Sequence, residues 1–210
     1  MTMNASNEDI FDKLQNIIRL TASQFYIWKK LQNIDNKEWY KMRWWFWVPI
    51  LITLQDSYML NLANIFDTDP NTLSLYSLIG NGVIDRTKKR EMKDKLKPKN
   101  RIINKLKSRR NNYTAHKNIG YTLDLRLISK DFPLKYWDIE DLLDLIIEML
   151  DNIRENFNKY GTSYVDYYKN LKEDCEKNTE FILKNGLHTQ WYKEAHKLIK
   201  KTITKIAIEH

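Results

Sequence analysis

The sequence predicts an all-α protein, and three of its features support this fold class. The chain has 210 residues, but only 5 are Gly and 4 are Pro. An all-β protein needs many tight turns built from these residues, so their scarcity favours long helices. Hydrophobic residues make up 42% of the chain and charged residues 30%, which is typical of a folded domain with a sizeable core. Apolar side chains also recur every three or four positions in several segments, as on one face of a helix.

The first half of the chain contains three predicted helices. In residues 7–31 the apolar positions follow helical spacing: Ile10, Leu14, Ile17, Ile18, Thr21, Phe25 and Trp28. A second helix is expected over residues 38–66, where Pro49 either kinks the helix or begins a fresh one. A short helix over residues 73–79 should follow, ended by the Gly-Asn-Gly sequence at residues 80–82.

The second half begins with strongly charged helices. Residues 85–95 have a helical composition but are almost entirely polar, so that only Met92 and Leu96 are available for packing. Pro98 breaks this segment, and a further helix is expected from about Lys99 onward.

The strongest apolar stripe predicts the central helix of the fold. It covers residues 138–157, and Asp138 is expected to act as its N-cap. The preceding residues 120–132 are predicted to be irregular or briefly extended, because leucines alternate there. Two more helices are expected over about residues 163–184 and 190–207.

Positive charge is concentrated in one part of the chain. Residues 86–117 contain 14 Lys or Arg and only 2 acidic residues, whereas the net charge of the whole chain is +8. A local excess of this kind is the electrostatic footprint of a surface that binds phosphate groups, and the alternative is a solvated, lysine-rich helix face. The candidate RNA-binding side chains are Lys93, Lys97, Arg101, Lys105 and Lys117.

The basic segment ends in a cluster of Arg, Asn and His side chains that suits RNA cleavage. Arg110 presents a planar fork of donors that fits a phosphate and stabilises the charge growing on it. An imidazole titrates near neutral pH, so His116 can take a proton from a ribose 2′-hydroxyl or donate one to the leaving oxygen. Asn111 can orient the histidine or hold a phosphate oxygen. Because the 2′-hydroxyl is an internal nucleophile, this reaction requires no metal ion and no cofactor.

Two residues near this cluster have open roles. Asp56, in the second predicted helix, either orients His116 or Arg110 or is a buried acid paired with another arginine. Tyr113 lies one turn before His116 and either contacts RNA or packs in the core.

One motif resembles the signature of the HEPN superfamily: Arg110-Asn111-x-x-x-Ala115-His116. The closest branch is that of the abortive-infection, AbiU-like HEPN proteins. Residues 54–67, which end in a Phe-Asp pair, are similar to the second helix of that branch. Residues 73–75 resemble its next short helix, and residues 138–157 resemble the helix that follows the motif. The resemblance covers about residues 7–160.

The resemblance implies an antiparallel helical bundle that dimerises, so that two Arg/His motifs form one composite cleft. It also implies RNA cleavage without a metal ion, by a toxin or phage-defence effector. The spacing of the motif favours Arg110 as the catalytic arginine, whereas on a straight α-helix it is Arg109 that shares a side with His116. Some toxin members carry a Tyr two residues after the His, where an antitoxin modifies them; here Asn118 takes that position.

Together these observations predict a HEPN-like bundle over residues 1–160 and a C-terminal extension of two further helices, residues 161–210, packed on the same domain. The predicted function is that of a homodimeric endoribonuclease, with RNA as its substrate and an antitoxin protein as a further partner. The alternative is a non-catalytic HEPN module that binds nucleic acid or a partner protein through the same basic face. The chain shows no targeting signal and no apolar run of about 20 residues, which predicts a cytoplasmic protein that does not enter the membrane. Cys175 is its only cysteine, which excludes an intrachain disulfide and a Cys-rich zinc site.

Overall fold

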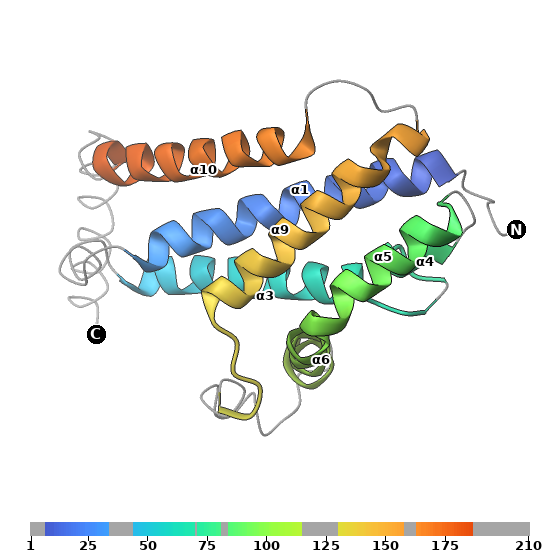
Figure 1. Ribbon diagram of the computed structural model, residues 1–210. Coiled ribbons are helices and arrows are strands. Elements are labelled where there is room, and N and C mark those ends of the chain that lie inside the picture. Colours follow the sequence, from blue (N-terminus) through green and yellow to red (C-terminus); the bar gives the residue numbers. More distant parts are fainter. Residues whose placement is uncertain are drawn as a thin grey trace, which may run out of the picture.

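The computed structural model describes residues 7–33, 44–69, 71–80, 84–114, 130–157 and 163–186. These residues form helices joined by turns and contain no strand, which confirms the all-α prediction (Figure 1). The α-helices are α1 (Asn7–Gln32), α3 (Trp44–Ile65), α4 (Leu75–Gly80), α5 (Arg86–Leu96), α6 (Asn100–Arg109), α9 (Tyr136–Ile153) and α10 (Tyr164–Gly186). Shorter helices of other types are η1 (Lys97–Lys99), η2 (Arg110–Thr114) and η3 (Arg154–Phe157). None of the described helices is long and apolar enough to cross a membrane.

Helix α1 forms the centre of the bundle and contacts α3, α4, α9 and α10. It lies between α10 and α3, antiparallel to α3, while α9 crosses in front of it (Figure 1). The predicted apolar face of α1 is the face that the bundle buries, since Leu14, Ile18, Thr21 and Phe25 are all fully buried. The helical spacing thus identified the core-facing side of α1 correctly.

Helix α3 runs from Trp44 through the exposed Pro49, so no fresh helix begins at the proline, and the expected start of this helix near residue 38 lies outside the described residues. A proline that close to the N-terminus removes one intrahelical hydrogen bond, while the rest of α3 is held by its packing against α1. Helix α9 begins at Tyr136, and Asp138 therefore lies within its first turn rather than at the N-cap. From there its Oδ2 accepts a 2.9 Å hydrogen bond from the backbone N–H of Lys135, the true N-cap residue.

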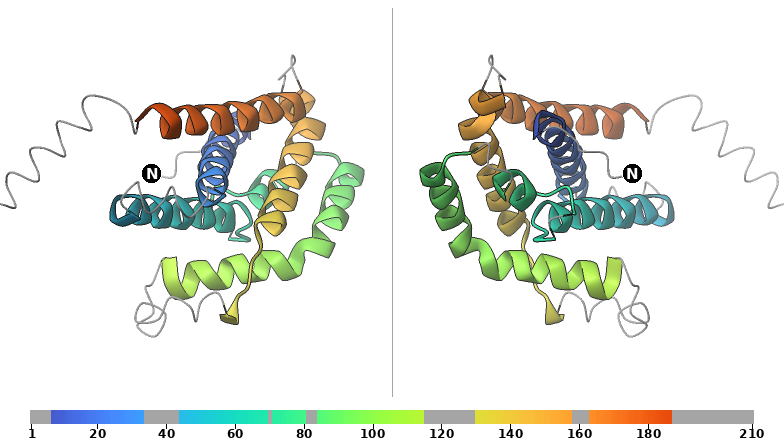
Figure 2. Two further views of the ribbon diagram at one scale, coloured as in Figure 1. Left: turned by 90° about the vertical axis from the view of Figure 1, so that its left-hand side faces the viewer. Right: turned by 90° about the vertical axis from the view of Figure 1, so that its right-hand side faces the viewer.

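The charged helices have the predicted form. Asp85 caps α5 by accepting hydrogen bonds from the N–H groups of Thr87 and Lys88, and the helix buries only Met92 and Leu96. Pro98 lies in the short 3-10 helix η1, which joins α5 to α6. The chain therefore bends at the proline and continues as α6, which crosses beneath α3 (Figure 2).

Helix α9 runs antiparallel to α5 and at a steep angle to α6 (Figures 1 and 2), and polar contacts join α9 and the residues before it to this part of the chain. Lys95 and Lys99 form ion pairs with Glu148 (2.6 Å) and Asp141 (2.9 Å). Further along, Lys105 Nζ donates to the carbonyl oxygen of Pro133 at 2.9 Å. Together with the hydrogen bond from Arg109 to Phe132, this contact places residues 132 and 133 beside the C-terminal half of α6, which ends at Arg109.

The predicted helix at residues 163–184 is present as α10, which packs against α1 and α9. The expected helix at 190–207 lies outside the described residues, as do residues 120–129 of the segment 120–132 that was expected to be irregular or extended. Residues 130 and 131 of that segment are helical, contrary to the expectation. The domain boundary at residue 160 stays a prediction.

Candidate Arg/His site

The α-helical geometry of α6 ends where the motif begins. From Arg110 to Thr114 the chain forms a π-helix, in which each turn is wider than an α-helical turn. Asn112 Nδ2 donates a 2.9 Å hydrogen bond to the Ser108 carbonyl across this transition. Arg109 would share a side with His116 only on a straight α-helix, and the chain is π-helical from Arg110 to Thr114 instead.

Arg109 is buried and binds the backbone of another segment of the chain. Only 7% of the residue is exposed, and its Nε donates a 2.8 Å hydrogen bond to the carbonyl oxygen of Phe132. Burial lowers the pKa of the guanidinium, although the nearby Tyr58 opposes this shift and an arginine keeps its charge in proteins. Arg109 therefore links α6 to the chain that leads into α9.

Arg110 turns to a different part of the molecule, the C-terminal end of α3. Its Nη1 donates to Oδ2 of Asp67 at 2.6 Å and to Oδ1 of Asn64 at 3.1 Å. Its Nε donates to Oδ1 of Asn111 at 2.9 Å. Among the described residues, no hydrogen bond is formed by Nη2 of Arg110.

The Arg110–Asp67 ion pair lies in a partly buried setting, with 17% and 20% of the two side chains exposed. Burial alone raises the pKa of Asp67, but the hydrogen bond from Arg110 and the backbone N–H of Asp69 outweigh it. The charges of Arg110 and Lys107 act in the same direction, so the pKa of Asp67 lies below its usual value. Burial, helped by Arg110, lowers the pKa of the Lys107 ammonium despite the opposing effect of Asp67. Two cations and one carboxylate thus form a compact cluster with excess positive charge.

The other predicted site residues are placed as follows. Asn111 is exposed and contacts Arg110 as described above. Asp56 lies in α3 eight residues before Asn64, about 12 Å along the helix axis, and the carboxylate that binds Arg110 is Asp67. Tyr113 belongs to the π-helix, but its side chain lies outside the described part of the chain, as do His116 and Lys117 entirely.

Sequence reasoning did not assign a role to Asn64, Asp67 or Lys107. Asn64 and Asp67 lie three residues apart at the C-terminal end of the apolar helix α3. Their neighbours Leu62, Ile65 and Phe66 are buried. The sequence signal for this pair was the spacing of two polar residues on one side of the helix, away from the buried stripe. This spacing predicts that the two side chains share a helix face, but it does not predict that Arg110 binds them.

The predicted basic face is divided by its contacts. Lys93 and Arg101 are exposed and have no ion-pair partner among the described residues. By contrast, Lys97 pairs with Asp94 at 2.7 Å, and Lys105 donates to the Pro133 carbonyl. Lys93 and Arg101 therefore have their charges available to a ligand, while Lys97 and Lys105 also serve local structure.

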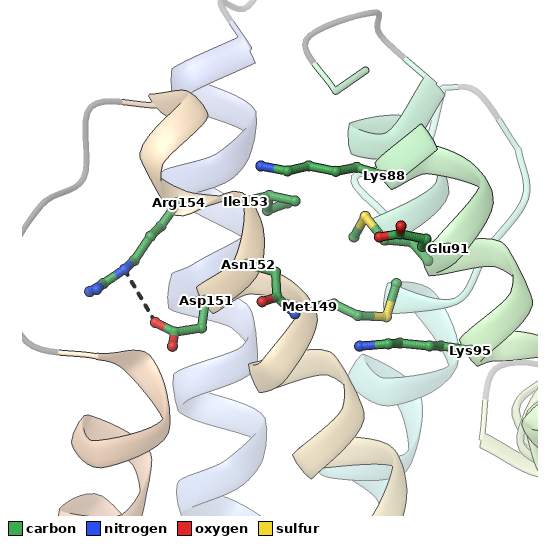
Figure 3. Close-up of a pocket in the computed structure, with 9 residues that line it drawn as sticks. Lys88, Glu91, Lys95, Met149, Asp151, Asn152, Ile153 and Arg154 are labelled. Carbon is green, nitrogen blue, oxygen red and sulfur yellow. Dashed lines mark ion pairs between the residues drawn. The ribbon is translucent and has the colours of Figure 1, made fainter. Parts of the chain in front are cut away.

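A pocket of about 470 Å³ lies between α5 and the C-terminal end of α9. Lys88 and Lys95 extend from α5 toward Asn152 and Ile153, while Arg154 turns away and pairs with Asp151 at 3.3 Å (Figure 3). The lining residues are Lys88, Glu91, Met92, Lys95, Met149, Asp151, Asn152, Ile153 and Arg154. One wall of the pocket is formed by α5, which is part of the basic segment, but Arg110 does not line the pocket. Within the described part of the chain, no group of three or more His, Cys, Asp or Glu could hold a metal ion.

Comparison with known proteins agrees with the motif and the fold. No curated protein and no solved structure matches the chain. A family model described as AbiU2, a HEPN family, matches residues 8–178. That match spans the helices from α1 through most of α10, and it extends further toward the C-terminus than the resemblance that the sequence motifs had indicated. The chain therefore belongs to the AbiU2 family of HEPN domains.

Proposed function

We propose that this protein is a metal-independent endoribonuclease of the abortive-infection type, with a composite Arg/His site at a homodimer interface. Its family supports the class of activity, because HEPN domains are often ribonucleases. The observation that carries the proposal is the orientation of Arg110. Its guanidinium is held on one side by Asn64 and Asp67, which leaves Nη2 for a phosphate oxygen.

In the proposed reaction His116 removes the proton of the ribose 2′-hydroxyl, and the resulting oxygen attacks the adjacent phosphorus. The bond to the 5′-oxygen breaks, and the leaving oxygen takes up a proton from an imidazolium. Arg110 stabilises the additional negative charge on the phosphorane oxygens. The products are a 2′,3′-cyclic phosphate and a free 5′-hydroxyl. In the dimer, the motif of the second protomer would supply the second imidazole.

Asp67 and Asn64 are positioning residues in this proposal, since they hold Arg110 and do not touch the substrate. A guanidinium that is already oriented loses less conformational freedom when it binds a phosphate. Lys107 would add to the positive field near the phosphate, because its charge already affects Asp67. The exposed Lys93 and Arg101 would guide the RNA backbone along α5 and α6.

The test is cleavage of mixed RNA in the presence of EDTA, with end-group analysis of the products. We expect cyclic phosphate ends, no cleavage of DNA, and a loss of about two to four orders of magnitude in rate for His116→Ala. Sedimentation of the same preparations tests the dimer. If the wild type and His116→Ala are equally inert on RNA and equally harmless when overexpressed, the nuclease proposal is wrong.

A second candidate function is a non-catalytic module that binds nucleic acid or a partner protein, such as an antitoxin, through the basic face. The observation that favours it is the ion pair itself, because Asp67 neutralises much of the charge of Arg110. In that case Arg110 would serve to join the π-helical turn to α3. RNA binding without cleavage, retained by both Arg110→Ala and His116→Ala, would support this function.

A further inference from the structure

Two large aromatic side chains are exposed at the start of α9. Tyr136 is 48% exposed and Trp137 is 46% exposed, although residues of this size normally bury most of their surface. Their rings pack against each other with centroids 4.9 Å apart and planes at 81°. The pair therefore presents a preorganised aromatic surface to solvent rather than two independent side chains.

Lysine ammonium groups lie over both rings. Lys135 Nζ is 4.7 Å from the centroid of Trp137, and Lys29 Nζ is 5.0 Å from that of Tyr136. Lys29 is also paired with Glu140 at 2.6 Å, whereas Lys135 has no carboxylate partner among the described residues. Aromatic rings interleaved with cations are the arrangement that single-stranded nucleic acids bind, since bases stack on the rings and phosphates pair with the cations.

The neighbouring charges favour an anionic occupant. Two acidic residues nearby are paired, Asp141 with Lys99 and Glu140 with Lys29 and Lys172, while Asp138 keeps its negative charge and accepts the backbone N–H of Lys135. Lys105, which holds the Pro133 carbonyl, adds a charge that no carboxylate neutralises among the described residues. A partner with a phosphate backbone therefore fits this surface better than an uncharged, apolar partner does.

The same chain segment is tied to the arginine motif. Phe132 and Pro133 accept hydrogen bonds from Arg109 and Lys105 at 2.8 Å and 2.9 Å, so the chain entering α9 crosses α6 (Figure 2). Tyr136 follows Pro133 by only three residues. The aromatic pair therefore comes directly after the two carbonyl groups that join this segment to α6.

We propose that Tyr136 and Trp137 form a stacking platform for the bases of single-stranded RNA, with Lys135 binding an adjacent phosphate. This inference rests on the proposed function for its choice of RNA. It adds a second binding element to the site: the arginine motif holds the scissile phosphate, and the platform holds neighbouring bases. Stacking is tolerant of sequence, so the platform would favour unpaired RNA over duplex rather than a particular base.

The experiment measures binding of a labelled single-stranded RNA by fluorescence anisotropy, in a His116→Ala background that prevents cleavage. The double variant Tyr136→Ala/Trp137→Ala should lose roughly 5- to 100-fold in affinity, whereas Tyr136→Phe/Trp137→Phe should lose much less. Leu20→Ala is the matched control, because Leu20 is an equally exposed apolar side chain on α1, at 53%. Circular dichroism and sedimentation establish that each variant keeps its fold and its oligomeric state.

Salt dependence distinguishes stacking from ionic contact. Because stacking releases no counterions, the alanine double variant should bind more weakly with an unchanged slope of log affinity against log salt. Unchanged affinity in this variant would overturn the platform, and so would its conversion to a monomer, which would identify the pair as a dimer contact. If the wild type cleaves RNA but the alanine double variant binds RNA as tightly as its parent, only the platform proposal is wrong. If RNA binding depends on the aromatic pair but the wild type does not cleave RNA, only the nuclease proposal is wrong.

Discussion

Arg110 and Asp67 form a 2.6 Å ion pair that joins the π-helical turn after α6 to the C-terminal end of α3. The two residues are 43 positions apart in the chain. Asn64 accepts a second hydrogen bond from the same nitrogen, Nη1, so this edge of the guanidinium is held against α3. The contact fixes the direction of the arginine that the motif places first.

The neighbouring arginines should respond differently to substitution. Arg110→Ala should abolish RNA cleavage with a stability loss of only about 1–2 kcal/mol, because it removes a partly buried pair. Arg109→Ala should cost about 1.5–3 kcal/mol, because Arg109 is buried and its loss frees the Phe132 carbonyl. Urea unfolding and cleavage rates, measured together, separate the two effects. Arg19→Ala, an exposed arginine on α1, is the control.

Arg110→Lys tests geometry apart from charge. Lysine keeps the positive charge but lacks the planar fork with which Arg110 contacts Asp67 and Asn64 and, in the proposed reaction, would also bind a phosphate. We therefore expect this variant to stay nearly as inactive as Arg110→Ala. Full activity in Arg110→Lys would show that only the local field matters.

The ion pair should make stability depend on pH. The folded-state pKa of Asp67 is depressed, so its carboxylate stabilises the fold above the unfolded pKa of about 3.9 and stops doing so as pH falls through the folded value. Asp67→Asn should therefore be less stable than the wild type at neutral pH. The difference should shrink below about pH 4, as followed by urea unfolding across pH. An equal difference at all pH values would show that Asp67 acts through packing.

The predicted RNA-binding side chains should differ in whether their substitution affects RNA affinity or stability. Lys93→Ala/Arg101→Ala should weaken RNA binding and reduce its salt slope, because both charges are exposed and free of ion pairs among the described residues. Lys97→Ala/Lys105→Ala should have a smaller effect on affinity and a larger effect on stability, since Lys105 holds the Pro133 carbonyl. Anisotropy titrations at several salt concentrations compare the two pairs. Equal RNA affinity in the wild type and Lys93→Ala/Arg101→Ala would mean that these side chains form only a solvated face.

The single cysteine should be a slow nucleophile. Burial raises the pKa of the Cys175 thiol, and the charges of Asp174 and Glu176 raise it further, against a lowering by the Ser23 hydrogen bond. Less thiolate is then present at neutral pH, and the thiolate is the reactive form. Reaction with a disulfide reagent should be slower in the folded protein than in urea at the same pH. A rate in the folded protein equal to that in urea would contradict this environment.

Much of the fold was predictable because helical spacing is a local property. The stripe from Leu14 to Phe25 identified the buried face of α1, and the polar composition of residues 85–95 left Met92 and Leu96 as the residues that pack. The helix ends were less certain, since capping depends on details such as the hydrogen bond from Lys135 to Asp138. At Pro49 the sequence left open a kink or a fresh helix, and the structure shows that α3 continues through the proline and packs against α1.

By itself the sequence determined the helical class, the concentration of positive charge and the position of the Arg/His motif, because each depends on composition or on short-range spacing. Only the tertiary structure decided which arginine faces which partner. The wider turn that begins at Arg110 changes the direction of each side chain, and the packing of α6 against α3 brings Asp67 within 2.6 Å of it. Arg109, one residue earlier, is directed to Phe132 instead. Adjacent residues thus acquire different partners from contacts between distant segments, which local patterns do not encode.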